Sequence, residues 1–160
     1  MNEHYFDLPA DVEKIIPHRL PMRLVDRILE ITDGIAIIEA QLSEGQLFID
    51  GTGELDNIAY VEMIAQAYAS MRGYRDRIEG LPIRDGFMVS VRKVKHYAAA
   101  FAGDMLKIHV SEVGEFDFFT VAEGKIYNKD QLLAQAQISL WIPETLEGKV
   151  NISGAMGQDL

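Results

Sequence analysis

The sequence predicts an α+β domain in which a curved antiparallel sheet wraps round one long central helix. Residues 56–78 repeat their apolar side chains with the period of a helix, nearly all round the helical wheel. After that segment the apolar period changes from 3.6 residues to two, which is typical of strands. The order is one strand, a buried helix and then about four consecutive strands.

The helix has a signal at each end. Asp56 and Asn57 are side chains that cap helix N-termini, and Gly80 followed by Pro82 is a stop signal. Apolar residues surround this helix, so we expect it to be buried on most sides, and its alanines would allow neighbours to approach closely: Ala59, Ala65, Ala67 and Ala69.

The strands are predicted from two-residue alternation and β-branched or aromatic content. One precedes the helix and four follow it, at residues 35–42, 87–94, 106–110, 115–127 and 132–142. Asn128, Lys129 and Asp130 form a hairpin turn signal before the last of them. We expect half-buried antiparallel strands with one face on the helix.

Composition limits the classes of function. The 160 residues are 48% apolar, as in an ordinary globular domain, and we assign residues 1–143 to one domain and 144–160 to a loose tail. The formal charge of −10 opposes nucleic acid or an anionic membrane as partner. The longest structured stretch without charge is 131–143, short of the ~20 residues of a membrane span. The chain has no cysteine and no secretory signal, so we expect a cytoplasmic protein without thiolate metal sites.

Glu62 is the only carboxyl group between residues 57 and 71 of the predicted helix. A buried, unpaired carboxylate costs several kcal/mol, so it needs a partner or must stay neutral part of the time. A carboxyl group in that position can exchange a proton in a reaction. The alternative is a narrow exposed stripe that Glu62 shares with Gln66 and Ser70.

Several segments, in consistent order over residues 12–143, resemble the 3-hydroxyacyl-acyl-carrier-protein dehydratases of the hotdog fold. Residues 16–27 read IPHRLPMRLVDR and residues 60–66 read YVEMIAQ, with Glu62 at the family's glutamate. The segments FMVS at 87–90, FAGD at 101–104 and LAQA at 133–136 also match. Within the family, the sequence is most similar to the predicted dehydratases of bacterial aryl-polyene clusters.

This resemblance implies removal of water from a 3-hydroxyacyl thioester on acyl carrier protein, giving the trans-2-enoyl thioester. It implies a homodimer or trimer of dimers whose sheets join edge to edge, and a tunnel between subunits where the glutamate faces a histidine of the partner chain. Glu62 is the implied catalytic carboxyl group, with Gln66, Phe87 and Ser90 at the substrate. The strand near Ser90 would supply a backbone donor to the thioester carbonyl. No metal or organic cofactor is needed, because the chemistry is proton transfer.

The sequence departs from the family where its catalytic histidine should stand. Residues 47–56 read LFIDGTGELD, without histidine or proline. Of the histidines at 4, 18, 96 and 109, we expect a terminal position for the first, a basic rim for the third and an outward strand face for the last. His18, within the matched signature, is therefore the predicted second catalytic group. Alternatively its imidazole only ties a loop by hydrogen bonds, and Asp50 or Asp56 serves near the site.

Positive charge is concentrated in residues 72–95, which hold seven basic and three acidic side chains. Because carrier proteins of this family are acidic, we predict that Arg92, Lys93 and Lys95 form a docking surface for the carrier. The alternative is a solvated strand face and a helix end whose dipole the arginines complement.

Three functions are compatible with the sequence. The first is the dehydratase. The second is an acyl-coenzyme A thioesterase of the same fold, in which Glu62 activates water or attacks the thioester and no histidine is needed. The third is a non-catalytic subunit that binds acyl chains or pairs as a heteromer with an active hotdog dehydratase.

Overall fold

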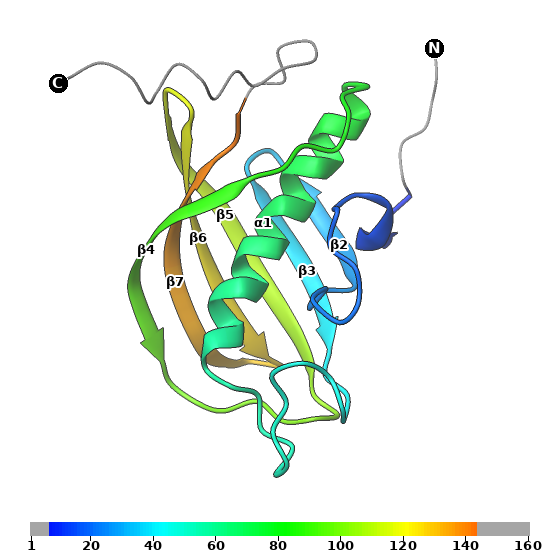
Figure 1. Ribbon diagram of the computed structural model, residues 1–160, viewed down its shortest axis with the longest axis vertical. Coiled ribbons are helices and arrows are strands. Elements are labelled where there is room, and N and C mark those ends of the chain that lie inside the picture. Colours follow the sequence, from blue (N-terminus) through cyan, green and yellow to red (C-terminus); the bar gives the residue numbers. More distant parts are fainter. Residues whose placement is uncertain (1–6, 144–160) are drawn as a thin grey trace, which may run out of the picture.

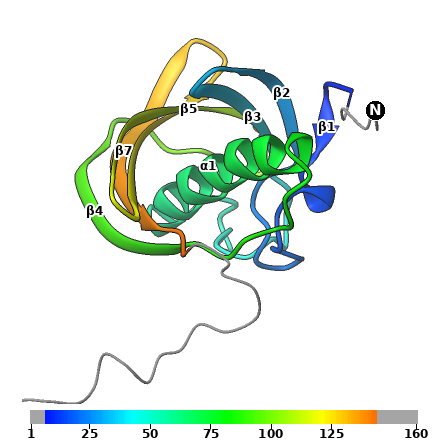
Figure 2. The same ribbon diagram turned by 90° about the horizontal axis from the view of Figure 1, so that it is seen from above.

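Helix α1 (Ile58–Ile78) lies in the concave face of a seven-stranded antiparallel sheet, which curls round it (Figures 1 and 2). The computed structural model describes residues 7–143, so the tail predicted at 144–160 and His4 lie outside the described residues. The predicted α+β architecture is confirmed, and it is the hotdog fold. The core forms between α1 and the concave face of the sheet.

The structure adds two strands, β1 and β2, before the predicted ones. A short helix, η1 (Val12–Lys14), separates the first two strands. The strands are β1 (Ala10–Asp11), β2 (Arg27–Thr32), β3 (Ile35–Gln41), β4 (Phe87–His96), β5 (Met105–Phe116), β6 (Phe119–Asn128) and β7 (Gln131–Trp141), in the sheet order β1-β2-β3-β5-β6-β7-β4.

Two details of the strand prediction were wrong, each for a local reason. Strand β2 was missed because a shift in its pairing with β3, between Ile28 and Glu30, breaks the two-residue alternation. The strand predicted from residue 115 begins only at 119. Asp117, with a left-handed φ of 53°, turns the chain inside an aromatic run that looked continuous.

The end signals of α1 are confirmed at Asp56 and Gly80, whereas the Asn57 side chain makes no capping hydrogen bond. The backbone N–H of Ile58 donates to the side-chain Oδ1 of Asp56 at 2.9 Å. At the other end Gly80 takes a φ of +73°, which a residue with a side chain rarely adopts. The chain then turns towards β4, and this connection forms one end of the cavity described below.

Strand β6 approaches α1 closely at Gly124, which faces Ile64 of the helix. A Cβ atom at position 124 would lie 2.6 Å from the Cγ1 of Ile64 and nearer still to its Cγ2, closer than packed carbon atoms tolerate. The absence of a side chain at residue 124 therefore sets how tightly the sheet closes on the helix.

We expect Gly124→Ala to lower the free energy of unfolding by about 1–3 kcal/mol, because the added methyl group overpacks the core. Urea denaturation of the variant measures the loss. Gly51→Ala is the matched control: nothing lies within 4 Å of the position its Cβ would take, so we expect stability within about 0.5 kcal/mol of the wild type. Equal stabilities for the two variants would contradict the close approach.

Strand β4 is at one edge of the sheet and is far more exposed than its alternation predicted. It pairs only with β7, and nine of its ten residues are exposed in the single chain. These include five apolar side chains: Phe87, Met88, Val89, Val91 and Val94. The prediction of a half-buried strand was wrong for the isolated chain, because no further strand covers this edge among the described residues.

Candidate active site

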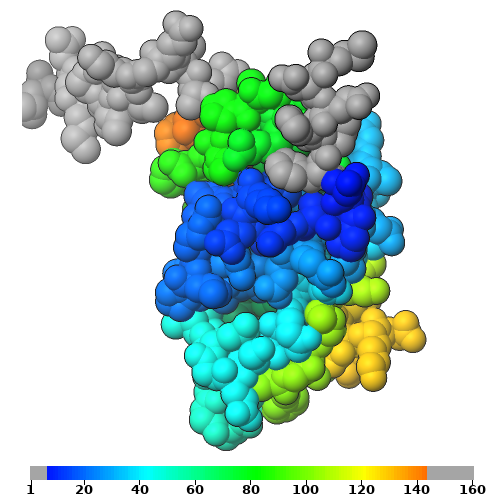
Figure 3. All heavy atoms as spheres, turned by 90° about the vertical axis from the view of Figure 1, so that its right-hand side faces the viewer, coloured from blue at the N-terminus to red at the C-terminus, as the bar shows by residue number. Residues whose placement is uncertain are grey.

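One cavity of about 350 Å³ runs beside α1, on the side of the helix that the sheet leaves open. Its walls come from three parts of the chain: the N-terminal segment, the helix, and the connection into β4 with the end of β7. They include Ile15, Pro17 and His18, then Glu62, Ala65, Ala69, Gly73 and Asp76, then Arg84, Phe87, Met88 and Ile142. Figure 3 shows the N-terminal segment, in blue, across the middle of one face of the molecule.

The two predicted catalytic side chains meet in this cavity. Nε2 of His18 lies 3.9 Å from Oε1 of Glu62, and the two side chains are 31% and 28% exposed. This distance is longer than a hydrogen bond, so the His18 imidazole and the Glu62 carboxyl group do not hydrogen-bond to each other. Both line the cavity, and both belong to the same chain.

The alternative role for His18, a loop tie made by its imidazole, is not what the structure shows. Nδ1 is buried without a hydrogen-bond partner among residues 7–143, and Nε2 is too far from Glu62 for a hydrogen bond. The loop is held through the backbone instead, because the guanidinium of Arg19 donates to the carbonyl oxygens of Ile16 and His18, each at 2.9 Å. The imidazole is therefore left available for another role.

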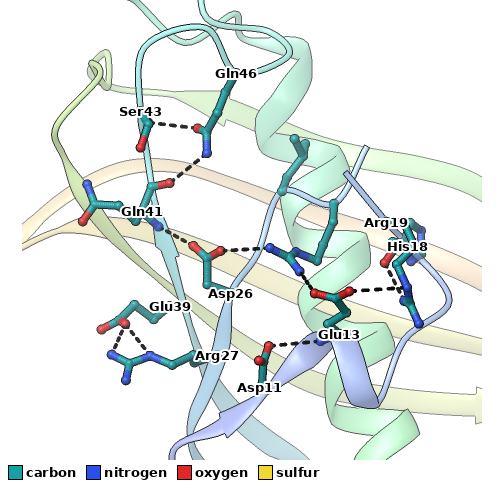
Figure 4. Close-up of polar contacts among 12 residues, drawn as sticks. Asp11, Glu13, His18, Arg19, Asp26, Arg27, Glu39, Gln41, Ser43 and Gln46 are labelled. Carbon is teal, nitrogen blue, oxygen red and sulfur yellow. Dashed lines mark hydrogen bonds and ion pairs between the residues drawn. The ribbon is translucent and has the colours of Figure 1, made fainter. Parts of the chain in front are cut away.

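A charged network fixes the segment that carries His18 (Figure 4). Arg23 lies 2.6 Å from the Glu13 carboxylate and 3.7 Å from that of Asp26. Asp26 in turn accepts a hydrogen bond from the backbone N–H of Gln41 at 2.7 Å, on β3. The segment is thus tied to η1 and to the sheet, so its histidine is held in position over α1.

Gln66 joins this segment to the helix. Its side chain is fully buried, and its amide nitrogen donates to Oε1 of Glu62 at 2.9 Å and to the carbonyl of Met22 at 2.7 Å. Its amide oxygen accepts from the backbone N–H of Leu24 at 2.7 Å. Gln66 thus holds the Glu62 carboxyl group and the His18 loop in one arrangement. The exposed stripe proposed for Glu62, Gln66 and Ser70 is wrong, since both Gln66 and Ser70 are buried.

We expect Gln66→Met to lower kcat about 10–100-fold with a smaller change in KM, because hydrogen bonds to charged groups contribute ~1.5–3 kcal/mol. Steady-state kinetics on a short 3-hydroxyacyl thioester, the substrate class that the sequence resemblance implies, separates the two constants. Ser70→Ala is the control, because the Ser70 hydroxyl donates to the Gln66 backbone without touching Glu62. A loss of kcat in Ser70→Ala equal to that in Gln66→Met would count against a positioning role for Gln66.

The other acidic candidates have structural roles. Oδ1 of Asp50 accepts from the hydroxyl of Thr52 at 2.6 Å and from the backbone N–H groups of Thr52 and Glu54 at 2.8 and 3.1 Å. These hydrogen bonds, that of the Thr52 hydroxyl first, lower the pKa of Asp50, which makes it a weaker base. Asp56 caps α1, and neither carboxyl group lines the cavity.

The histidines at 96 and 109 lie on strands of the sheet, on β4 and β5 respectively. His109 lies on the outward face of β5 as predicted and contacts Tyr127, and burial, followed by the charge of Lys107, lowers its pKa. His96 is exposed on β4, the strand that also carries Lys93 and Lys95, so the basic rim expected for it stays a prediction. It pairs with Ala134 of β7, and its ring lies 5.3 Å from that of Tyr60.

The predicted substrate residues divide into two groups. Phe87 lines the cavity, next to Met88. Ser90 lies further along β4, opposite Ser139 of β7, and Gln66 lies behind Glu62, so neither forms part of the cavity wall. The backbone donor near Ser90 stays a prediction.

The basic side chains of residues 72–95 fall into two groups, those with carboxylate partners and those without. Arg72, Arg75 and Arg84 form ion pairs at 2.7–2.9 Å with Glu115, Glu112 and Asp76 respectively. Among residues 7–143 no ion pair involves Arg92, Lys93 or Lys95, on β4. The partners of these arginines are far away in sequence or lie on the other side of a turn. The periodicity of a single segment therefore could not predict the Asp76–Arg84 pair at the end of the cavity.

Comparisons with known proteins agree with the fold. The chain is 26% identical over 143 residues to the 3-hydroxyacyl-[acyl-carrier-protein] dehydratase FabZ of a Nitratiruptor species, covering 83% of this chain and 95% of that protein. The FabZ of Oenococcus oeni is 30% identical over 107 residues, covering 64% and 75%.

Among solved structures, the dehydratase heterocomplex ApeI:P from Xenorhabdus doucetiae matches with a TM-score of 0.78 and 21% identity, covering 85% of this chain and 93% of that one. A hypothetical thioesterase with coenzyme A from Streptococcus pneumoniae TIGR4 matches less closely, with a TM-score of 0.58 and 14% identity, covering 72% and 84%. These two likenesses support the hotdog fold.

No helix within residues 7–143 is long and apolar enough to cross a membrane. The family model of the ApeP dehydratases matches residues 10–151, which is most of the chain and includes both His18 and Glu62. The chain therefore belongs to the ApeP-like dehydratase family.

Proposed function

We propose that this protein removes water from a 3-hydroxyacyl thioester carried on acyl carrier protein and releases the trans-2-enoyl thioester. Membership of the ApeP-like dehydratase family and the similarity to FabZ dehydratases support the reaction class. One observation carries the assignment to this site: His18 and Glu62 lie 3.9 Å apart at one end of a largely apolar cavity.

The reaction needs two proton transfers on neighbouring carbon atoms. A base takes the proton from C2, beside the thioester carbonyl, the C2–C3 double bond forms, and the C3–O bond breaks as an acid protonates the hydroxyl group to give water. Because the C2 proton and the C3 hydroxyl are only a few ångströms apart, the base and the acid must also be close. His18 and Glu62 satisfy that condition, and Gln66 holds the carboxyl group in place.

The partner chain is a second part of the proposal. The open edge of β4, with its exposed apolar side chains, is suited to pairing with the same edge of another hotdog subunit. The matched ApeI:P structure is a heterocomplex, so we propose that β4 joins either a second copy of this chain or a related dehydratase. Such an interface would bury Val89 and Val91, which the single chain exposes.

The carrier protein is proposed to dock on Arg92, Lys93 and Lys95, on the strand that begins at the cavity. Unlike Arg72 and Arg84, these side chains have no carboxylate partner among residues 7–143, so their charge is available to an acidic protein.

We expect Arg92→Glu with Lys95→Glu to raise KM about tenfold for a carrier-bound substrate and to leave KM for the pantetheine thioester unchanged. An equal rise for both substrates would contradict docking.

The experiment that tests the reaction is mass spectrometry of a 3-hydroxyacyl carrier protein incubated with the wild-type protein. We expect a loss of one water from the acyl group. Release of free thiol without loss of water would instead support the thioesterase. Absence of turnover over several acyl chains, with activity after addition of a second hotdog dehydratase, would replace the proposal with the non-catalytic subunit.

A further inference from the structure

The cavity is elongated along α1. Along α1 its wall includes Glu62, Ala65, Ala69, Gly73 and Asp76, which lie along one side of the helix, together with the neighbouring Tyr68 and Arg72. With a helical rise of about 1.5 Å per residue, the fourteen steps from Glu62 to Asp76 span roughly 21 Å. The cavity therefore extends from the proposed catalytic pair towards the C-terminal end of α1.

The middle of the cavity offers an apolar surface. Ala65, Ala69 and Gly73 leave a strip of the helix wall almost without side-chain volume, bordered by the larger side chains of Tyr68 and Arg72. The N-terminal segment, β4 and the end of β7 add apolar side chains to the lining: Ile15, Ile16, Met88, Leu140 and Ile142. Hydrocarbon is the chemical group that such a surface accommodates. Any substrate whose C2 and C3 atoms reach Glu62 can place its acyl tail here.

An ion pair lies at the far end of the cavity. Arg84, in the connection between α1 and β4, donates from Nε and Nη2 to the two carboxylate oxygens of Asp76 at 3.0 and 2.7 Å. Asp76 is only 4% exposed, and Arg72 approaches it to 3.8 Å. A two-point pair between a buried carboxylate and a partly buried guanidinium is rigid and hydrophilic, so it is a poor surface for a methyl terminus.

We propose that the acyl chain lies along Ala65, Ala69 and Gly73 and that the Asp76–Arg84 pair sets the longest chain the protein accepts. This inference rests on the proposed function, because the reacting carbons are placed at Glu62. C–C bonds of ~1.5 Å in a zigzag advance the chain by about 1.3 Å per carbon. Ala69, roughly 10 Å along the helix from Glu62, then lies beside about the eighth carbon beyond the reacting centre.

The test measures kcat/KM for carrier-bound 3-hydroxyacyl groups of about six and about fourteen carbons. A leucine at position 69 would fill the middle of the cavity, so Ala69→Leu should lower the ratio of long-chain to short-chain kcat/KM by about tenfold or more. Val61→Leu enlarges a side chain of the same helix outside the cavity and should keep the wild-type ratio. An unchanged ratio in Ala69→Leu would overturn the proposed path.

The end of the path is tested by the double variant Asp76→Asn with Arg84→Ala, which removes the pair without leaving a buried charge alone. The roughly 21 Å from Glu62 to Asp76 holds about sixteen carbons beyond the reacting centre, so this test compares acyl groups of about twenty-two and about fourteen carbons. We expect the ratio of kcat/KM for the longer group to that for the shorter group to rise about tenfold in the double variant. A ratio that stays at the wild-type value in a folded variant would show that the pair does not set the limit. Circular dichroism confirms the fold of each variant.

A binding measurement separates this inference from the proposed reaction. Dissociation constants for free 3-hydroxy fatty acids of the same lengths need no turnover. If the wild type has no activity but Ala69→Leu selectively weakens binding of the long acids, the proposed reaction fails and the acyl path stands. If the wild type is active but neither variant alters the length dependence of binding or turnover, the acyl path fails alone.

Discussion

Glu62→Gln is expected to lower kcat/KM for dehydration by about 10²–10⁴-fold, which is what a positioned acid or base contributes. The carboxamide keeps nearly the shape of the carboxyl group but cannot take or give the proton. The buried Gln66 amide that donates to Oε1 of Glu62 can still donate to the new side-chain oxygen, so we expect the variant to fold. The measurement is the initial rate of water loss from a 3-hydroxyacyl carrier protein.

Glu79→Gln is the matched control for that prediction. Glu79 follows the last residue of α1, is exposed, and does not line the cavity, so the same chemical change there should leave the rate at the wild-type value. Activity of Glu62→Gln within about threefold of the wild type would remove Glu62 from the chemistry, given the size of acid–base effects.

His18→Ala is expected to lower kcat/KM by about 10²-fold or more, and a mixture with Glu62→Gln should not restore it. The reason is that His18 and Glu62 meet within one chain. In a hybrid dimer of the two variants, each site then lacks one member of the pair. The resemblance to other hotdog dehydratases implied the opposite arrangement, with the histidine supplied by the partner chain.

The mixing experiment requires co-expression of the two variants with different tags and native mass spectrometry to identify the hybrid dimer. Recovery of dehydration in the hybrid, with each parent variant inactive, would mean that His18 of one subunit serves Glu62 of another, and the one-chain site would be wrong. Co-expressed wild-type chains carrying the same two tags are the positive control. A hybrid no more active than its parents agrees with the structure.

The structure changes which part of the family resemblance matters most. Residues 47–56 lack the family's histidine, and Asp50 and Asp56 in that region are engaged in a turn and a helix cap. His18 comes instead from the N-terminal segment, which lines the same cavity as Glu62. A proton-transfer pair is thus available without the missing segment, which favours a dehydratase over a non-catalytic subunit.

The sequence determined the elements because their signals are local. Asp56 and Gly80 bound the helix, and two-residue alternation located most strands; it failed at β2 and at Asp117, where a bulge and a hidden turn interrupt the period. Glu62 was identifiable because a lone carboxyl group in an apolar helix is energetically unusual. These inferences use only neighbours within about one helical turn or one strand.

Only the tertiary structure decided which distant residues meet. The hydrogen bonds of Gln66 to Met22 and Leu24, more than forty residues away in sequence, place the His18 segment over the helix. Arg84 was grouped with the other basic residues by sequence, yet it lines the cavity, where it pairs with Asp76. Such contacts depend on strand register and on how the chain packs across α1, because the periodicity of a segment fixes its own faces and not the segment that will cover them.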